Sequence, residues 1–183
     1  MRIIAGQAKG HHLKVPREVS RPTTDRVRES LFGILSPVVS GARVLDLFAG
    51  SGALGLEALS RGAAECLLVE RDRGACRVIE ENLKKTGLTC GQVRCGEVAR
   101  FLKGRVGPFD LILADPPYAD GLSDPAAALS RLTVWRDCLA EGGILVLEED
   151  ATGHLLEFVG LTFWQSREYG RSRISFYRRE DPS

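Results

Sequence analysis

Four consecutive residues, Asp115-Pro116-Pro117-Tyr118, carry the strongest chemical signal in the sequence. The two prolines fix the backbone angle φ twice and remove two N–H donors, so the turn offers mainly acceptors, the Asp115 carboxylate and the Pro116 carbonyl. Two acceptors can hold both N–H groups of an exocyclic aromatic amine and aim its lone pair at an electrophile, and Asp115 can take up the proton. Tyr118 adds a flat face for a base that has left its stack. The motif predicts a catalytic site for a nucleobase amine.

The segment from Asp46 to Gly55 has the composition of a nucleoside-binding loop. Gly50, Gly52 and Gly55 match G-x-G-x-x-G, and Glu70 follows twenty residues after Gly50, where an acid can hold ribose hydroxyls. A nicotinamide or flavin oxidoreductase is one interpretation of this loop. Asp46 argues against it, because a pyrophosphate beside that carboxylate would cost several kcal/mol once desolvated. S-adenosylmethionine carries a sulfonium and an ammonium group and no phosphate, so the loop favours this cofactor.

The elements that would position these residues alternate along the chain. We expect strands at 42–48, 65–70, 91–95, 109–114 and 143–149. Between them we expect helices at 53–61, 72–86, 97–103 and 124–139. Two late strands, at 161–168 and 172–178, have no helix between them and predict an antiparallel hairpin. Strands separated by helices indicate a parallel sheet that is covered on both faces and binds ligands beyond the carboxyl ends of its strands. Asp46, Glu70 and Asp115 all lie at or just beyond the carboxyl ends of these expected strands.

The N-terminal part of the chain has a different pattern. Short strands at 2–4 and 12–15 predict a small basic hairpin, and Thr24 is the expected N-cap of a helix at 25–35. We therefore expect an N-terminal basic β-hairpin extension at 1–20 and a methyltransferase domain at 21–183.

Charge is unevenly distributed although the net charge is only +1. Residues 1–30 carry seven Lys and Arg against three acids, residues 167–179 carry five Arg against one Glu, and residues 31–166 carry 13 basic against 18 acidic side chains. Basic ends around an acidic centre indicate a polyanion bound at the edges and a cationic ligand in the middle. Ordinary solvated charge explains the same pattern equally well.

Other features of the composition narrow the class of protein. No apolar run is long enough to span a membrane, and the first 15 residues lack the apolar segment of a secretory signal. The five cysteines include no C-x-x-C pair, which indicates reduced thiols rather than zinc or disulfides. We expect a cytoplasmic protein that uses no metal.

The motifs together resemble the amino-methyltransferases of nucleic acids, and nearly the whole chain is similar to the RsmD family of bacterial 16S ribosomal RNA guanine-N2 methyltransferases. The resemblance is carried by RIIAG at 2–6, RPTTDRVRESLF at 21–32, FAGSGALGLEALSRG at 48–62 and DPPY at 115–118. The second segment is the most specific, since many relatives share the glycine loop and the D-P-P-Y motif.

The resemblance implies a Rossmann-like, class I S-adenosylmethionine-dependent α/β fold with a mostly parallel seven-stranded sheet, a C-terminal antiparallel hairpin and a short N-terminal β-hairpin. It also implies methylation of the N2 amine of one guanine, number 966, in the 16S rRNA of the 30S subunit or a late assembly intermediate. We expect a monomer, although no sequence motif bears on the oligomeric state. The expected catalytic residues are Asp115, Pro116, Pro117 and Tyr118. The expected cofactor-binding residues are Asp46, Phe48, Gly50, Ser51, Gly52, Glu70, Arg71, Glu97 and Val98. The residues expected to contact the target base or RNA are Arg2, Lys9, Arg21, Thr23, Thr24, Arg28, Arg171 and Arg173.

Several alternatives stay open. The acceptors at Asp115 suit the N6 amine of adenine as well as the N2 amine of guanine, so an adenine methyltransferase acting on RNA or DNA is the near rival. An inactive RNA-binding assembly module is a rival of another class. Glu97 could accept from the adenine amine of the cofactor or simply cap a helix. His11 and His12 stand where the family leads us to expect arginines, which weakens the expected hold on phosphate.

Overall fold

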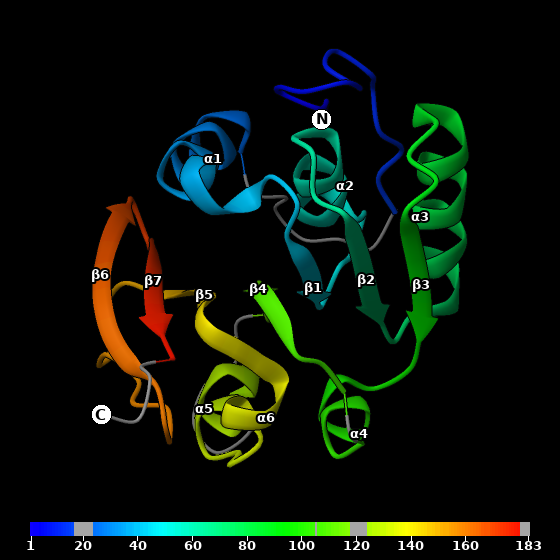
Figure 1. The fold of residues 1–183 in the computed structure, drawn as a ribbon. Helices are drawn as coiled ribbons and strands as arrows, with labels where there is room; N and C mark the ends of the chain where they lie inside the picture. The colour runs from blue at the N-terminus through cyan, green and yellow to red at the C-terminus, as the bar shows by residue number, and fades with distance from the viewer. Residues whose placement is uncertain (17–23, 105, 118–123, 180–183) are drawn as a thin grey trace.

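A seven-stranded sheet runs through the middle of the molecule and carries helices on both faces (Figure 1). The computed structural model describes residues 1–16, 24–104, 106–117 and 124–179. In chain order the elements are α1 (Asp25–Val39), β1 (Arg43–Leu47), α2 (Ala53–Ser60), β2 (Glu65–Glu70), α3 (Arg73–Thr86), β3 (Gly91–Cys95), α4 (Val98–Leu102), β4 (Phe109–Ala114), α5 (Pro125–Ser130), α6 (Trp135–Cys138), β5 (Leu139–Asp150), β6 (Thr162–Tyr169) and β7 (Ser172–Arg178).

The strand order is β3-β2-β1-β4-β5-β7-β6. The first five strands in this order are parallel to one another, whereas β7 is antiparallel to both β5 and β6. The predicted parallel sheet with a C-terminal antiparallel hairpin is therefore confirmed. The strand order reverses between β1 and β4, and in open sheets of this kind the crevice at such a reversal is the usual ligand site.

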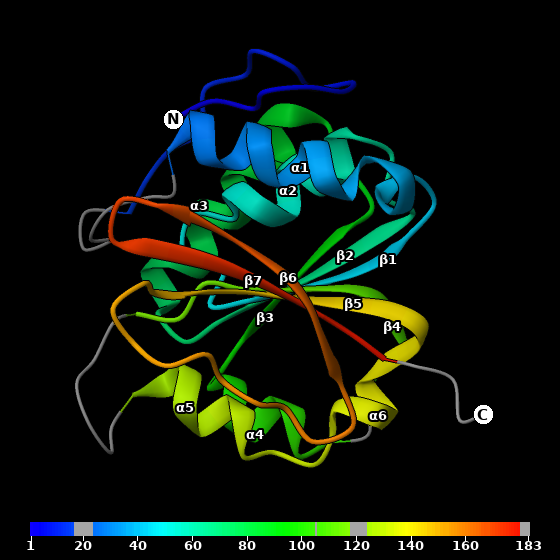
Figure 2. The same cartoon turned by 90° about the vertical axis from the view of Figure 1, so that its left-hand side faces the viewer.

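Two hydrophobic layers hold the sheet between the helices. Val44 and Leu111 point to the face that packs against Phe32 of α1 and Leu56 of α2, while Leu45 belongs to the layer under α4, α5 and α6. Figure 2 shows α1, α2 and α3 on one side of the sheet and α4, α5 and α6 on the other. Because both faces are covered, successive residues of the central strands are buried rather than alternately exposed.

The N-terminal segment packs directly on α2. Glu57, which is fully buried, accepts hydrogen bonds from the backbone N–H groups of Ile4 (2.8 Å) and Ala5 (3.1 Å) and pairs with Arg61. Ile3 and Leu13 belong to the same hydrophobic layer as α2. The expected N-terminal hairpin is present as one antiparallel bridge between residues 2 and 12. The boundary between an extension at 1–20 and a domain at 21–183 stays a prediction.

Three elements differ from the prediction. Helix α1 continues to Val39, because Leu35 and Val39 are one turn apart and both are buried. The single helix expected at 124–139 is two short helices, since the carbonyl of Leu129 accepts from the Leu132 N–H and from the Trp135 indole N–H. Strand β5 begins at Leu139, where it pairs with β4. None of the described helices is both long and apolar enough to cross a membrane.

We expect Glu57→Gln to lower the free energy of unfolding by about 2 kcal/mol, because the new amide N–H₂ would face donors at a buried position. Chemical denaturation measures this loss, and hydrogen exchange should show faster exchange at Ile4 and Ala5. Glu65→Gln is the matched control: Glu65 also pairs with an arginine, but its side chain is 44% exposed, so its loss should stay below about 0.5 kcal/mol. Equal losses in the two variants would contradict the role given to Glu57.

Candidate active site

The loop between β1 and α2 has an unusual backbone. Phe48, Gly50 and Gly52 all have positive φ, at 60°, 56° and 78°. Gly52 also lies so close to Leu56 that an added Cβ would come within 2.5 Å of its Cδ1. A non-glycine residue held at positive φ is strained, and such strain is common at ligand sites. The sequence around the glycine motif thus folds into a fixed turn at the carboxyl end of β1.

Glu70 holds this turn from the neighbouring strand. One carboxylate oxygen accepts from the Gly50 N–H at 2.9 Å and the other accepts from the Asp72 N–H at 2.8 Å. Each carboxylate oxygen can accept more than one hydrogen bond, so the same group retains capacity for the hydroxyls of a bound ribose. The structure brings Glu70 and the glycine loop together, as the sequence spacing predicts.

Asp46 lies beneath the loop rather than on its surface. It is 1% exposed, and its Oδ2 accepts from the Gly55 N–H at 2.8 Å. Burial raises the pKa of Asp46 to about 7; the hydrogen bond from Gly55 lowers it, and the nearby carboxylates of Asp115 and Glu70 raise it further. Carboxylates from the end of β2 and from the turn after β4 therefore act electrostatically on Asp46 at a single edge of the sheet.

The acceptor-rich turn follows β4 at the same edge. The backbone N–H of Asp115 lies 3.4 Å from the Leu47 carbonyl at the end of β1, which ties the turn to the strand that carries the glycine loop. Asp115 is partly exposed, Pro116 is buried and Pro117 is exposed. Tyr118 lies outside the described residues, so its stacking role stays a prediction.

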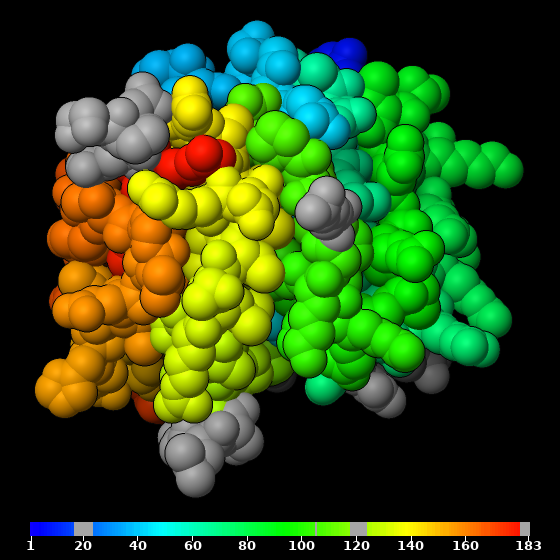
Figure 3. Space-filling model, turned by 60° about the horizontal axis from the view of Figure 1, so that its bottom comes forward, coloured from blue at the N-terminus to red at the C-terminus, as the bar shows by residue number. Residues whose placement is uncertain are grey.

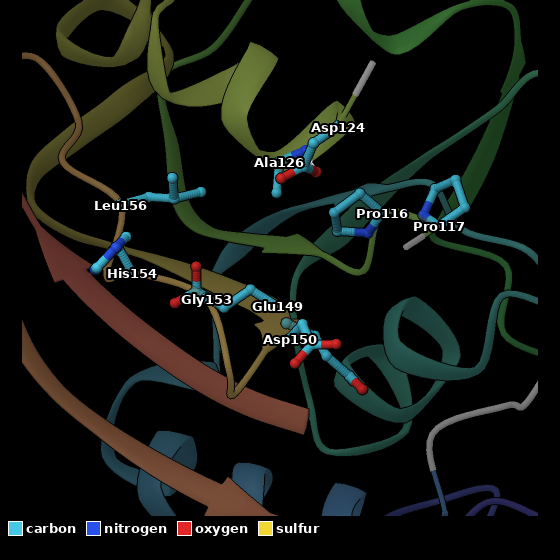
Figure 4. A pocket seen from close by; sticks show the side chains of 10 residues that line it. Pro116, Pro117, Asp124, Ala126, Glu149, Asp150, Gly153, His154 and Leu156 are labelled. Atoms are coloured by element: carbon cyan, nitrogen blue, oxygen red, sulfur yellow. Dashed lines mark hydrogen bonds between the residues drawn. The ribbon is translucent and has the colours of Figure 1, made fainter. Parts of the chain in front are cut away.

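A cavity of about 210 Å³ opens beside this turn. Figure 4 shows Pro116 facing the first turn of α5 on one side and the end of β5 on the other. The residues that line the cavity are Pro116, Pro117, Asp124, Ala126, Glu148, Glu149, Asp150, Gly153, His154 and Leu156. Pockets for drug-sized ligands are larger, at roughly 300–1,000 Å³, so this cavity suits one flat ring system.

The layer of helices on the cavity's side of the sheet is seen in Figure 3, where α4 is green, α5 and α6 are yellow-green to yellow, and the chain after β5 is orange. The lining residues come from the turn after β4, the start of α5, the end of β5 and the segment 153–156. The cavity is therefore built from parts of the chain that the parallel sheet brings together at its carboxyl edge.

Arg173 has a different position from the one expected. It was expected to contact RNA, but its side chain is only 10% exposed, and its Nε donates to Glu149 Oε1 at 3.0 Å. Ser175 donates to the same oxygen at 2.6 Å. The sequence reasoning missed Glu149, although an acid at the carboxyl end of a buried strand was the signal that had marked Asp46 and Glu70.

Two residues expected to bind the cofactor, Arg71 and Glu97, are exposed on the surface near β3. Glu97 is the N-cap residue of α4 but its side chain makes no capping hydrogen bond. It lies 3.9 Å from Arg71, and both side chains are about two-thirds exposed. Val98 is buried in the first turn of α4. Ser51, also expected at the cofactor, is buried and donates to the Met1 sulfur.

The basic residues expected to face RNA divide into two groups. Arg2, Lys9, Thr24 and Arg171 are exposed. Arg28 is not at the surface: its side chain is fully buried, and its Nη2 donates to the Arg2 carbonyl and to Asp25. Among the described residues, the Arg28 Nε and Nη1 atoms have no hydrogen-bond partner. Arg21 and Thr23 lie outside the described residues.

In the part of the chain that the structure describes, no group of three or more His, Cys, Asp or Glu side chains is arranged to hold a metal ion. The expected absence of a metal remains an expectation.

Comparison with known proteins identifies relatives along nearly the whole chain. The family model described as conserved hypothetical protein 95 matches residues 1–178. The Bacillus subtilis protein YlbH is 40% identical over 98% of this chain and 99% of its own length. Ribosomal RNA small subunit methyltransferase D of Escherichia coli is 40% identical over 85% of this chain and 77% of its own.

The fold has a close match among solved structures. The Escherichia coli protein yhhF superposes with a TM-score of 0.85 at 36% identity, covering 98% of each chain. The family model and the identity to methyltransferase D agree with the motifs RPTTDRVRESLF and DPPY, and with the acidic edge at which they would act. The chain belongs to the RsmD family of ribosomal RNA methyltransferases.

Proposed function

We propose that this protein transfers a methyl group from S-adenosylmethionine to the exocyclic N2 amine of guanine 966 in the 16S rRNA of the small ribosomal subunit. The observation that carries the proposal is the acceptor-rich turn at Asp115 and Pro116. Its Asp115 N–H is tied to Leu47, at the end of the strand that carries the glycine loop, and its prolines line a cavity the size of one base. The protein acts as a monomer in the cytoplasm on an assembled or assembling subunit.

The residues present fit the cofactor. Glu70 is placed to accept from the ribose hydroxyls, and Asp46 puts a negative charge beneath the loop that attracts the ammonium and sulfonium groups. The Nη2 of Arg28 already pairs with Asp25, but its Nε and Nη1 have no partner among the described residues, and these two N–H groups fit the cofactor's carboxylate because buried donors without acceptors are costly. A small anion suits Arg28 better than an RNA phosphate, since none of its side chain is exposed.

The chain's own residues prepare the amine for reaction. The bound cofactor supplies an electrophilic methyl group. The Pro116 carbonyl and the Asp115 carboxylate accept the two N–H bonds of the amine, which directs its lone pair, and Asp115 offsets the positive charge that develops on the nitrogen. Because the base must leave its stack to reach the cavity, the enzyme needs a flipped nucleotide.

Transfer of tritium from labelled S-adenosylmethionine to small subunits that lack the modification tests the proposal directly, with nucleoside analysis of the product. Label in N2-methylguanosine supports it. Label in N6-methyladenosine would replace guanine by adenine as the target, and bound cofactor without any transfer would favour an inactive assembly module.

Asp115→Ala should reduce turnover by about 10²- to 10⁴-fold and leave cofactor affinity nearly unchanged, because Asp115 acts on the amine. Single-turnover kinetics and calorimetric titration measure the two effects separately. Asp110→Ala is the matched control: it removes the same group from the other end of β4, where Asp110 accepts from the Arg43 N–H. Near-normal turnover in Asp115→Ala would overturn the amine-aiming role.

Cofactor affinity should depend on pH through Asp46. Since the pKa of Asp46 is raised to about 7, the group loses its charge as the pH falls from 8 to 6, and affinity should fall by about tenfold over that range if only the ionised form binds. Asp46→Asn should bind more weakly and should lack this dependence. Calorimetric titrations of both proteins decide the point, and parallel pH profiles would contradict it.

A further inference from the structure

We infer that Glu149 selects guanine over adenine by accepting a hydrogen bond from the N1–H of the base held in the cavity. This inference rests on the proposed function, because it assigns a specificity-determining contact within the same site. Neither Glu149 nor the residues that hold it belong to the motifs that define the family resemblance.

Glu149 is a carboxylate in a fixed orientation. It lies one residue before the end of β5, is 6% exposed and lines the cavity together with Pro116 and Pro117. The pairing of β5 with β7 places Glu149 directly opposite Arg173. Arg173 Nε and the Ser175 hydroxyl both donate to the same oxygen, Oε1. The other oxygen, Oε2, takes no part in these two contacts and is the atom that can accept from a base.

Arg173 is itself held in place. Its Nη2 donates to the Gly153 carbonyl at 3.0 Å, so the guanidinium bridges the end of β5 and the segment that closes the cavity. A buried arginine with bonds in two directions keeps the carboxylate from rotating, as positioning groups do behind precise binding contacts. Arg173 and Ser175 are therefore positioning residues, and Glu149 is the residue that touches the base.

The position of Glu149 matches the geometry of a guanine. Ala114 pairs with Leu147 across β4 and β5, so Pro116 and Glu149 each stand two residues beyond that pair on neighbouring strands. In guanine the ring atom N1 is bonded to C2, the carbon that carries the N2 amine, so the N1–H and N2–H donors lie side by side on one edge of the base. In the orientation that we propose, the amine is held at Asp115 and Pro116 and N1 faces Glu149 at the end of the adjacent strand.

The chemistry of the cavity discriminates between the two purines. An ionised carboxylate only accepts hydrogen bonds. Guanine offers N1–H as a donor, whereas adenine carries a lone pair at N1, which a desolvated carboxylate repels. The other charged groups on the wall are the carboxylates of Asp124, Glu148 and Asp150, so the wall as a whole favours donors. Sites built to bind a donor reject analogues that lack it much more strongly than apolar pockets reject a change in size.

The test compares guanine with 2-aminopurine at the target position. 2-Aminopurine keeps the 2-amine that is methylated but has an acceptor at N1. Small subunits assembled with either base are methylated by the wild-type protein and by Glu149→Gln, whose amide can donate to the acceptor. We expect wild type to prefer guanine by about 10- to 100-fold in kcat/KM, from one hydrogen bond to a charged group, and Glu149→Gln to lose most of that preference.

Two further variants make the comparison specific. Glu157→Gln removes the same charge from an exposed position on the segment after β5, and it should keep the full preference. Ser175→Ala removes one of the two donors to Oε1, and it should weaken the preference less than Glu149→Gln does; it also serves if Glu149→Gln does not fold. The ratio of the two substrates within one preparation does not depend on the fraction of active protein.

The outcomes separate this inference from the proposed function. If Glu149 only supports β5 and β7, both substrates lose activity together and the ratio stays at the wild-type value, which would overturn the inference. Equal rates on the two bases in wild type would overturn it as well. In both cases N2-methylguanosine from wild type would leave the proposed function standing. Methylation of adenine instead would remove the proposed function and this inference together.

Discussion

The parallel pairing of β1 with β4 is the constraint on which the site depends. These two strands lie at the point where the strand order reverses, and their pairing brings the glycine loop and the Asp115 turn to the same edge of the sheet. The hydrogen bond between the Asp115 N–H and the Leu47 carbonyl continues that pairing into the turn. Both hydrophobic layers act on this arrangement, because they cover the same two strands from opposite sides. A shift of register between β1 and β4 would separate the cofactor loop from the catalytic turn.

Acidic residues lie at the carboxyl ends of the strands at this edge, yet they have different tasks. Asp46 is buried and holds the Gly55 N–H, Glu70 holds the Gly50 N–H, and Glu149 is held by Arg173. These tasks differ because the hydrogen-bond donors differ. Asp46 and Glu70 accept from backbone N–H groups of the glycine loop, whereas Glu149 accepts from side chains of β7, which runs antiparallel to β5. An edge of this kind favours cations and hydrogen-bond donors over anions, and that preference matches both a charged sulfonium ligand and an amine.

Local patterns predicted the parts of the fold that depend on local causes. Strands 65–70 and 109–114 coincide with β2 and β4, because their apolar runs reflect burial on both faces. Strand 91–95 coincides with β3 although no residue of this strand is buried. The helix at 124–139 was wrong as a single element, since a tertiary contact, the Trp135 indole on the Leu129 carbonyl, interrupts it. The expectation that ligands bind at the carboxyl ends of parallel strands identified Asp46, Glu70 and Asp115. It could not identify the burial of Arg28 or the pairing of Arg173 with Glu149, because both depend on which distant segment covers the side chain.

The anchoring of the N-terminal segment on α2 has a consequence for the order in which the chain takes shape during synthesis. The backbone donors of Ile4 and Ala5 are made first, but their acceptor, Glu57, is more than fifty residues away in the chain. Asn82, which binds Lys14, is made later still. Ile4, Ala5 and Lys14 must therefore wait for α2 and α3 before these hydrogen bonds can form, and closing so long a loop carries an entropic cost. The segment 1–14 therefore cannot take up its final position until α3 has been made.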